Sequence, residues 1–108
     1  MPSKGLDAGP ATDLARLVEY GDDAIVSRIL LRTEGGNVTL FAFDEGQDLS
    51  EHTTKFDALI AVVDGSAEVV VGSTEHHVDT GQVILLPANV PHAVRASGRF
   101  KMILTMLK

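Results

Sequence analysis

Short apolar runs, each ended by turn residues, are the feature that most constrains how this chain folds. The runs are rich in Val, Ile, Leu and Phe, and glycine-containing turns such as Glu34-Gly35-Gly36-Asn37 and Thr80-Gly81 separate them. Seven or eight short strands at this spacing predict an all-β sandwich or barrel rather than alternating helices and strands. The runs predicted as strands are Ala24–Arg32, Asn37–Phe43, Ala58–Val63, Ala67–Val71, Val83–Leu86, His92–Arg95 and Phe100–Leu107.

Local signals add a hairpin, a helix and a tail to this expectation. Asp64-Gly65 lies between two apolar runs, and an Asp-Gly pair in that position is a strong hairpin signal. Near the N-terminus, Leu14, Leu17 and Val18 follow helical spacing, which predicts a short helix that Asp13 caps and that ends near Tyr20. Residues 1–12 are small and polar and predict a flexible N-terminal tail, followed by a single barrel domain over residues 13–108.

Composition excludes several classes of function. The chain has 108 residues and no cysteine, so thiolate metal ligands, a cysteine nucleophile and disulfides are ruled out. A net charge of −6, no Trp and one Tyr argue against nucleic acid as a partner. No apolar run approaches the roughly 20 residues of a membrane span, and the first residues lack the apolar core of a signal peptide. We therefore expect a cytoplasmic protein with no membrane partner.

Two strands are apolar on both sides, which predicts association. In Val38–Phe43 and in Met102–Leu107, both alternating faces carry apolar residues. A barrel interior covers only one face of each strand, so the other face needs a second cover. We expect a homodimer with two-fold symmetry, formed through a sheet face or a strand edge.

The stretch from Gly46 to Ala96 resembles the paired motifs of the cupin superfamily. In the first motif, Gly46 is followed by five residues and then His52, and Gly65 closes the motif at the right distance. In the second, Gly81 is followed by five residues, Pro87 and then His92 in register. The resemblance implies a small single-domain conserved barrel of two antiparallel sheets, jelly-roll-like, with His52 and His92 pointing inward from neighbouring strands.

The same motifs depart from the family pattern at four positions. Family members that bind a divalent metal use three His and one Glu, whereas the second His position holds Thr54 here and the Glu position holds Ala58. The second motif has Asn89 in place of Gly and Ala96 in place of Asn. Of the four family ligands, the resemblance keeps only His52 and His92.

Three interpretations of the histidine pair stay open. In the first, His52 and His92 hold a divalent metal (Zn, Fe, Ni or Mn), and a shift of one residue turns Asp57 inward as a further ligand. In the second, both imidazoles are hydrogen-bonded groups of a polar pocket without metal. In the third, one of them acts as a general base that Asp57 orients. Other predicted pocket residues are Thr54, Phe56 and Met102, of which Phe56 and Met102 also suit core packing.

The remaining histidines and the function follow from weaker signals. His76 and His77 stand in the polar stretch after Gly72 and are predicted to lie at the surface, with His76 in the pocket as the alternative. The favoured function is a module that binds a small molecule in the barrel pocket. The alternatives are a metal-dependent oxygenase or isomerase acting on a small organic acid, a metal-free His acid–base isomerase or epimerase, and a structural or regulatory dimer.

Overall fold

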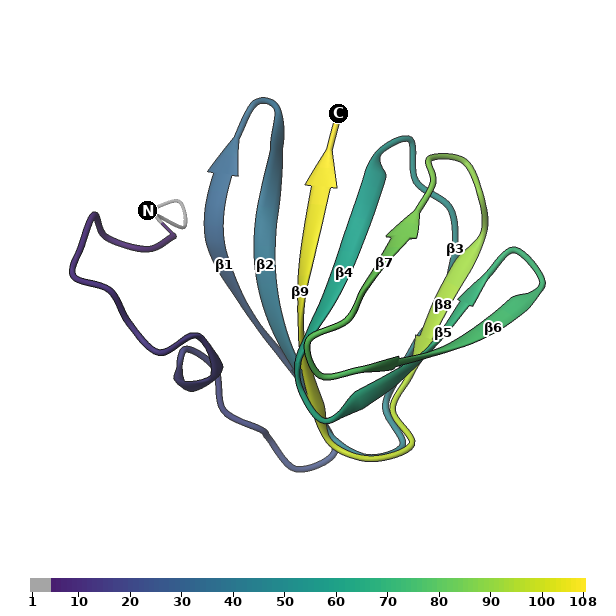
Figure 1. Ribbon diagram of the computed structural model, residues 1–108, viewed down its shortest axis with the longest axis horizontal. Coiled ribbons are helices and arrows are strands. Elements are labelled where there is room, and N and C mark those ends of the chain that lie inside the picture. The colour runs from purple at the N-terminus through teal and green to yellow at the C-terminus, as the bar shows by residue number, and fades with distance from the viewer. Residues whose placement is uncertain (1–4) are drawn as a thin grey trace.

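Two antiparallel sheets form the protein, as the computed structural model of residues 5–108 shows (Figure 1). Within these residues, the larger sheet has the order β1-β2-β9-β4-β7, with β1 (Ile25–Thr33), β2 (Gly36–Phe43), β9 (Phe100–Leu107), β4 (Asp57–Asp64) and β7 (Val83–Leu86). The smaller sheet has the order β3-β8-β5-β6, with β3 (Asp48–His52), β8 (His92–Arg95), β5 (Ser66–Val71) and β6 (Thr74–Asp79). The predicted all-β fold is confirmed.

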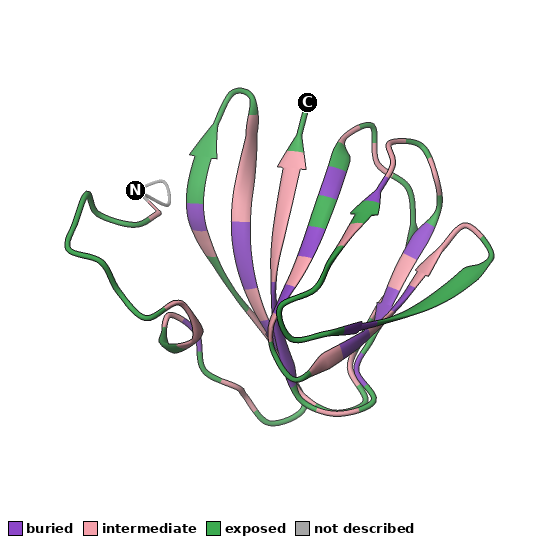
Figure 2. Ribbon diagram, in the orientation of Figure 1, coloured by how far each residue is buried: buried purple, intermediate pink, exposed green. Residues whose placement is uncertain are grey.

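The main core lies between the two sheets, because side chains along a strand alternate between its faces. In β4, for example, Ala58, Ile60 and Val62 are buried in the core, whereas Asp57 and Leu59 are exposed (Figure 2). The core is closed at the corner where the sheets meet by two stacked aromatic rings. The centroids of Phe43 and Phe100 are 4.5 Å apart.

The predicted hairpin at Asp64-Gly65 is wrong. β4 pairs with β7 and β9 in the larger sheet, whereas β5 pairs with β6 and β8 in the smaller one. Asp64-Gly65 is therefore a corner at which the chain changes sheet. The dipeptide signal reports a left-handed bend, and Gly65 does have a φ of +73°. It carries no information on which strands the bend joins.

Two strands escaped prediction because they are polar. β3 and β6 carry mostly exposed side chains, and β6 is the edge of its sheet, so neither shows the apolar alternation that marks a half-buried strand. They form strands because their backbones pair with neighbouring strands, β3 with β8 and β6 with β5. The two unpredicted strands, β3 and β6, contain three of the four histidines, so missing them bears directly on the site.

The predicted helix to Tyr20 is a single 3-10 turn, Leu14–Arg16. The side chain of Asp13 makes no capping hydrogen bond, and so short a segment does not sustain a helix in water on its own. Packing holds the segment instead. The Nζ atom of Lys101 donates to the carbonyl of Ala15 and lies 4.8 Å from the centre of the Tyr20 ring.

The tail and location stay predictions. Residues 1–4 of the predicted tail lie outside the residues that the structure describes, and the Leu6 amide donates to the carbonyl of Leu30 beside β1. Residues 5–108 contain no helix with the length and apolar character that a membrane crossing requires.

Candidate functional site

His52 and His92 meet at the paired ends of β3 and β8. They are direct cross-strand partners, so their side chains leave the sheet on the same face. His92 is buried, whereas His52 is exposed. The two Nε2 atoms are 3.1 Å apart, and the rings meet edge to face at an interplanar angle of 71°.

Backbone carbonyls fix how each ring carries its proton. The Nδ1 atom of His52 is 2.8 Å from the carbonyl oxygen of Ser50, and the Nδ1 atom of His92 is 3.2 Å from that of Val90. A carbonyl oxygen only accepts, so Nδ1 is the donor in both rings. In the neutral form, each Nε2 then keeps its lone pair, and the two lone pairs face one another. This arrangement favours a cation or a proton between the two nitrogens.

The surroundings of His92 disfavour its protonated form. Burial lowers the pKa of His92 below its ordinary value, and the neighbouring His52 lowers the pKa further. The hydrogen bond to the Val90 carbonyl acts in the opposite direction, but the net shift of the pKa is downward. The Nε2 lone pair of His92 is therefore available under conditions in which an exposed imidazole is partly protonated.

A rigid turn delivers His92 to its position. Pro87 and Pro91 each fix a backbone φ, and Asn89 between them has a φ of +66°, a conformation that Asn tolerates well. The amide of Asn89 donates to the carbonyl of Thr54, which ties this turn to the β3–β4 connection. Both histidines are thus attached to segments that brace one another.

The other predicted site residues are engaged elsewhere. The Thr54 hydroxyl accepts a hydrogen bond from the amide of Phe56, within the β3–β4 connection. Met102 is fully buried in the main core. Phe56 is half-buried beside Met106, in a cavity of about 300 Å³ near the C-terminal end of β9.

The expectation that Asp57 turns inward is wrong. The register of β4 buries Ala58 and exposes Asp57, because neighbouring side chains point to opposite faces. The Asp57 carboxylate accepts a hydrogen bond from the amide of Ala88 instead. Across residues 5–108, no group of three or more His, Cys, Asp or Glu side chains is placed to hold a metal ion. The structure brings together His52 and His92 and adds neither Asp57 nor Thr54 to them.

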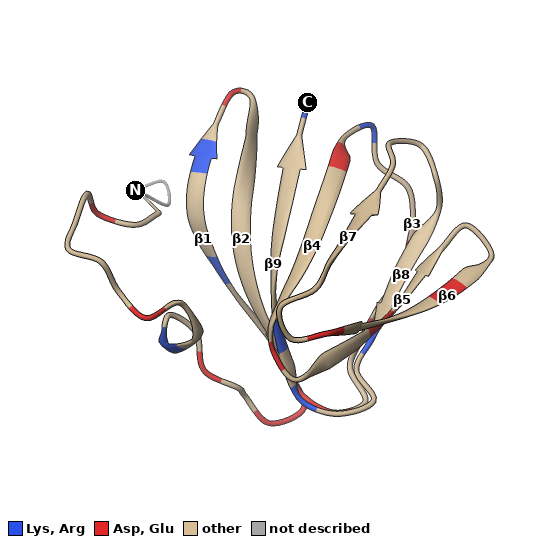
Figure 3. Cartoon of the chain, viewed as in Figure 1, with Lys and Arg blue, Asp and Glu red and all other residues tan. Residues whose placement is uncertain are grey.

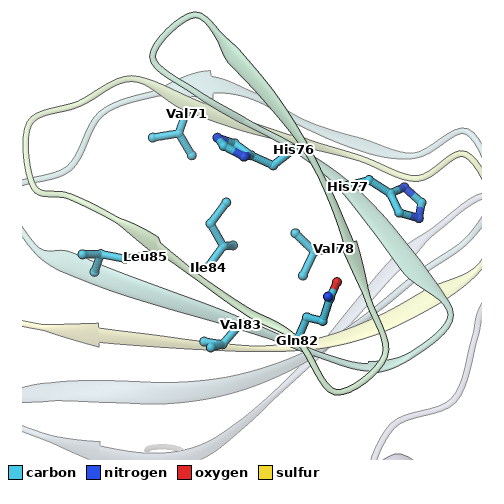
Figure 4. A pocket seen from close by; sticks show the side chains of 8 residues that line it. All are labelled: Val71, His76, His77, Val78, Gln82, Val83, Ile84 and Leu85. Carbon is cyan, nitrogen blue, oxygen red and sulfur yellow. The ribbon is translucent and has the colours of Figure 1, made fainter.

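A cavity of about 380 Å³ lies between the edge strands β6 and β7, and His76 lines it (Figure 4). His76 is the cross-strand partner of the buried Val69, so it shares the inner face of the smaller sheet. Val71 connects the cavity to the histidine pair, because it lines the cavity and is also the partner of His92 in β8. His76 is exposed, as predicted, but it points into the cavity. The period of two relative to the apolar Val78 is the signal for this in the sequence.

His77 points the opposite way and forms an ionic cluster. Its Nδ1 and Nε2 atoms are 2.5 Å from Glu68 Oε1 and 2.8 Å from Asp79 Oδ1. The hydrogen bond to Glu68, followed by that to Asp79, raises the pKa of His77. The predicted surface location of His77 is confirmed. Neither carboxylate partner was predicted. Glu68 lies on a different strand, and Asp79 shares the face of His77 only because this polar segment forms a strand.

Known proteins of similar sequence and structure agree with this geometry. A family model described as a cupin domain matches residues 39–107. The crystal structure of a conserved protein of unknown function from Streptococcus pyogenes is 30% identical, covers 100% of this chain and 96% of that one, and has a TM-score of 0.92. A cupin superfamily protein from Desulfitobacterium hafniense is 27% identical, with 99% and 98% covered and a TM-score of 0.90.

A cupin 2 conserved barrel domain protein from Leptotrichia buccalis is 37% identical, with a TM-score of 0.86. The match covers 90% of this chain and 47% of that protein. No protein of curated function matches the sequence.

Proposed function

The chain belongs to the cupin family, and on that premise we propose that it binds a small oxygen-donor molecule through a divalent cation held by His52 and His92. The observation that carries this proposal is the pair of Nε2 lone pairs that face one another at 3.1 Å. Each imidazole also donates its Nδ1–H to a backbone carbonyl, which is the usual arrangement around metal-binding histidines.

The distance between the nitrogens suits two ligands of one metal ion. Metal–nitrogen bonds are about 2.0–2.1 Å long, so two such ligands lie about 2.9 Å apart at a right angle and about 3.4 Å apart at the tetrahedral angle. The separation of 3.1 Å falls between these values. Imidazole suits Zn, Ni and Fe, with Mn the weaker candidate. Such an ion would supply a Lewis acid with open coordination positions for an oxygen ligand.

With two protein ligands, the site is expected to bind metal weakly. Structural metal sites in proteins usually supply four ligands, and catalytic ones supply three. The open positions and the neighbouring cavity favour reversible binding of a small molecule over a permanently held ion. Small carboxylates are suitable ligands, because their oxygens coordinate hard and borderline cations. The oxygenase, isomerase and epimerase alternatives stay predictions.

Titration calorimetry with Zn²⁺ and Ni²⁺ at pH 7.5 tests the proposal. We expect one site per chain with a dissociation constant of about 1–100 μM, corresponding to about 5–8 kcal/mol, which EDTA strips completely. His92→Ala and His52→Ala should each abolish this binding, whereas the matched variant His77→Ala should retain it. Metal-loaded protein should also gain thermal stability from small carboxylates that the metal-free protein does not respond to. Absence of any metal binding by the wild type would refute the proposal.

A further inference from the structure

Three basic side chains have no ionic or hydrogen-bonding partner among residues 5–108, although the chain has a net charge of −6. They are Arg32, Lys55 and Lys108. The other lysines and arginines of this range each contact a carboxylate or a backbone carbonyl, and these are Arg16, Arg28, Arg95, Arg99 and Lys101. Exposed cations often lack partners, so the position of these three side chains decides whether they form a site.

The three residues belong to one end of the barrel. Arg32 lies near the end of β1, Lys108 follows β9, and Lys55 lies in the connection between β3 and β4. Figure 3 shows these three places as blue segments along the upper edge of the view. The backbone amide of Lys108 donates to the carbonyl of Gly35, which fixes the end of β9 beside the β1–β2 turn.

Arg32 and Lys108 line the cavity of about 300 Å³ that also contains Phe56. The strand register explains the place of Arg32, because Arg32 pairs with Asn37 and Asn37 pairs with Met106, and both partners line the cavity as well. Direct cross-strand partners project to the same side of a sheet. The volume corresponds to about ten water molecules at roughly 30 Å³ each, which is enough for a small organic molecule.

This cavity offers hydrogen-bond donors to a ligand. The guanidinium group of Arg32 and the ammonium group of Lys108 can only donate. The Thr39 hydroxyl donates to Oδ1 of Asn37 at a distance of 3.3 Å, so the amide oxygen of Asn37 is engaged and its NH₂ group is left for a ligand. Phe56 and Met106 supply an apolar wall.

The acidic residues near this end of the barrel do not line the cavity. Glu34 lies in the turn between β1 and β2. Asp57 is exposed at the start of β4, where its carboxylate accepts a hydrogen bond from the amide of Ala88. More distant acidic groups are screened beyond about 8 Å at physiological ionic strength. The lining groups therefore favour an anion with several acceptor oxygens.

We propose that this cavity binds a small phosphate monoester, with the phosphate at Arg32 and the organic body against Phe56 and Met106. A phosphate monoester carries a charge of about −2 near neutral pH and has three acceptor oxygens, and the planar guanidinium group matches phosphate with two parallel hydrogen bonds. No histidine lines this cavity. Binding there is therefore independent of a metal ion at His52 and His92.

Titration of the ¹⁵N-labelled chain with phenyl phosphate in the presence of EDTA tests the proposal. We expect a dissociation constant of about 0.1–1 mM and chemical-shift changes at the cavity residues, including the side-chain NH₂ group of Asn37. Arg32→Gln should raise the dissociation constant about tenfold or more. Arg32→Lys should have a smaller effect, because lysine keeps the charge but loses the paired donors.

The matched control is Arg16→Gln, which removes the same charge from an exposed position outside the cavity and should bind like the wild type. Phe56→Ala should weaken the binding of phenyl phosphate and leave that of inorganic phosphate unchanged. Benzoate has the same ring but a single charge, and it should bind at least about tenfold more weakly than phenyl phosphate.

Absence of shifts in the wild type up to about 10 mM phenyl phosphate would overturn the proposal. Equal losses of affinity in Arg32→Gln and Arg16→Gln would also overturn it, because the net charge alone would then explain the binding. Benzoate that binds as tightly as phenyl phosphate would overturn the assignment to a phosphate. Because EDTA removes metal ions, none of these outcomes depends on the metal site proposed at the histidine pair.

Discussion

Gly65 lies against the backbone of Arg99. A Cβ atom on Gly65 would be 2.4 Å from the carbonyl oxygen of Arg99, and the φ of Gly65 is +73°. The contact closes the corner at which the chain passes from β4 to β5, opposite the segment that leads into β9. Because the nearest atom is a backbone oxygen, no rotamer change can relieve the clash with a side chain at this position.

Replacing Gly65 should therefore destabilise the fold more than replacing a comparable glycine. Gly46 has a similar φ of +84°, but a Cβ atom there meets no atom within 4 Å. We expect Gly46→Ala to lower the free energy of unfolding by about 1–2 kcal/mol, the cost of the left-handed conformation. Gly65→Ala adds the steric clash and should cost about 3 kcal/mol or more. Urea denaturation measures both values, and equal costs would contradict the steric account.

Thr54→His should strengthen metal binding, because it puts a third imidazole at the position of the second His in the family motif. The wild-type hydroxyl accepts a hydrogen bond from the Phe56 amide, so the variant also loses a local contact. We expect the dissociation constant for Ni²⁺ to fall about tenfold or more, together with a loss of unfolding free energy of about 1 kcal/mol. Titration calorimetry and urea denaturation separate the two effects. An unchanged metal affinity would show that the Thr54 position is too distant.

Ala58→Glu should be tolerated poorly, although the family motif has Glu at this position. Ala58 is buried in the main core, where a carboxylate without a partner costs several kcal/mol unless it takes up a proton. Burial would raise the pKa of the new carboxyl group. Its penalty is then smallest below pH 4, where the unfolded chain is protonated as well, and grows as the pH rises through the raised value.

The matched variant for this test is Ala93→Glu, since Ala93 is only half-buried in β8. Its stability should vary little with pH relative to the wild type. The comparison uses melting temperatures of both variants at pH 4 and pH 8. Equal losses at the two pH values in Ala58→Glu would argue against a buried carboxyl group.

His77 should make the melting temperature depend on pH. Its hydrogen bonds to Glu68 and Asp79 raise the pKa of His77 in the folded chain above the ordinary value of about 6.5. The stabilisation is therefore fully present below about pH 6.5 and is lost as the pH rises through the raised value. His77→Gln should lower the melting temperature at pH 6 and leave it nearly unchanged at pH 9.

The control for His77 is His76→Gln, because His76 lies next in the chain but on the opposite face of β6. It should show the pH profile of the wild type. The effect of His77→Gln should also shrink at 1 M salt, because the cluster is exposed and its charges are screened. A difference between His77→Gln and the wild type that is the same at pH 6 and pH 9 would contradict the predicted sign.

The local sequence pattern was sufficient to predict features that depend only on a residue and its neighbours in the chain. The apolar run Ala58–Val63 indicated a strand, and the Pro87–Pro91 segment with its central Asn89 indicated a rigid turn. Strand character and turn conformation are short-range properties, because the apolar pattern and the allowed φ values belong to each residue and its neighbours. The expectation that His52 and His92 point inward from neighbouring strands came instead from the resemblance to the cupin motifs.

The pairing of strands that are distant in the sequence decided how the two sheets are connected and which side chains meet, and no local sequence pattern predicts such pairing. The bend at Asp64-Gly65 is readable from the sequence, but only the pairing of β4 with β9 and of β5 with β8 shows that it joins two sheets. Likewise, the tertiary register turns Asp57 out to the Ala88 amide and brings Glu68 to His77. The sequence alone therefore determined the apolar strands and the rigid turn before His92, but it missed the polar strands β3 and β6. The packing of two sheets over one core decided which side chains surround the histidines, since each cross-strand neighbour comes from a distant part of the chain.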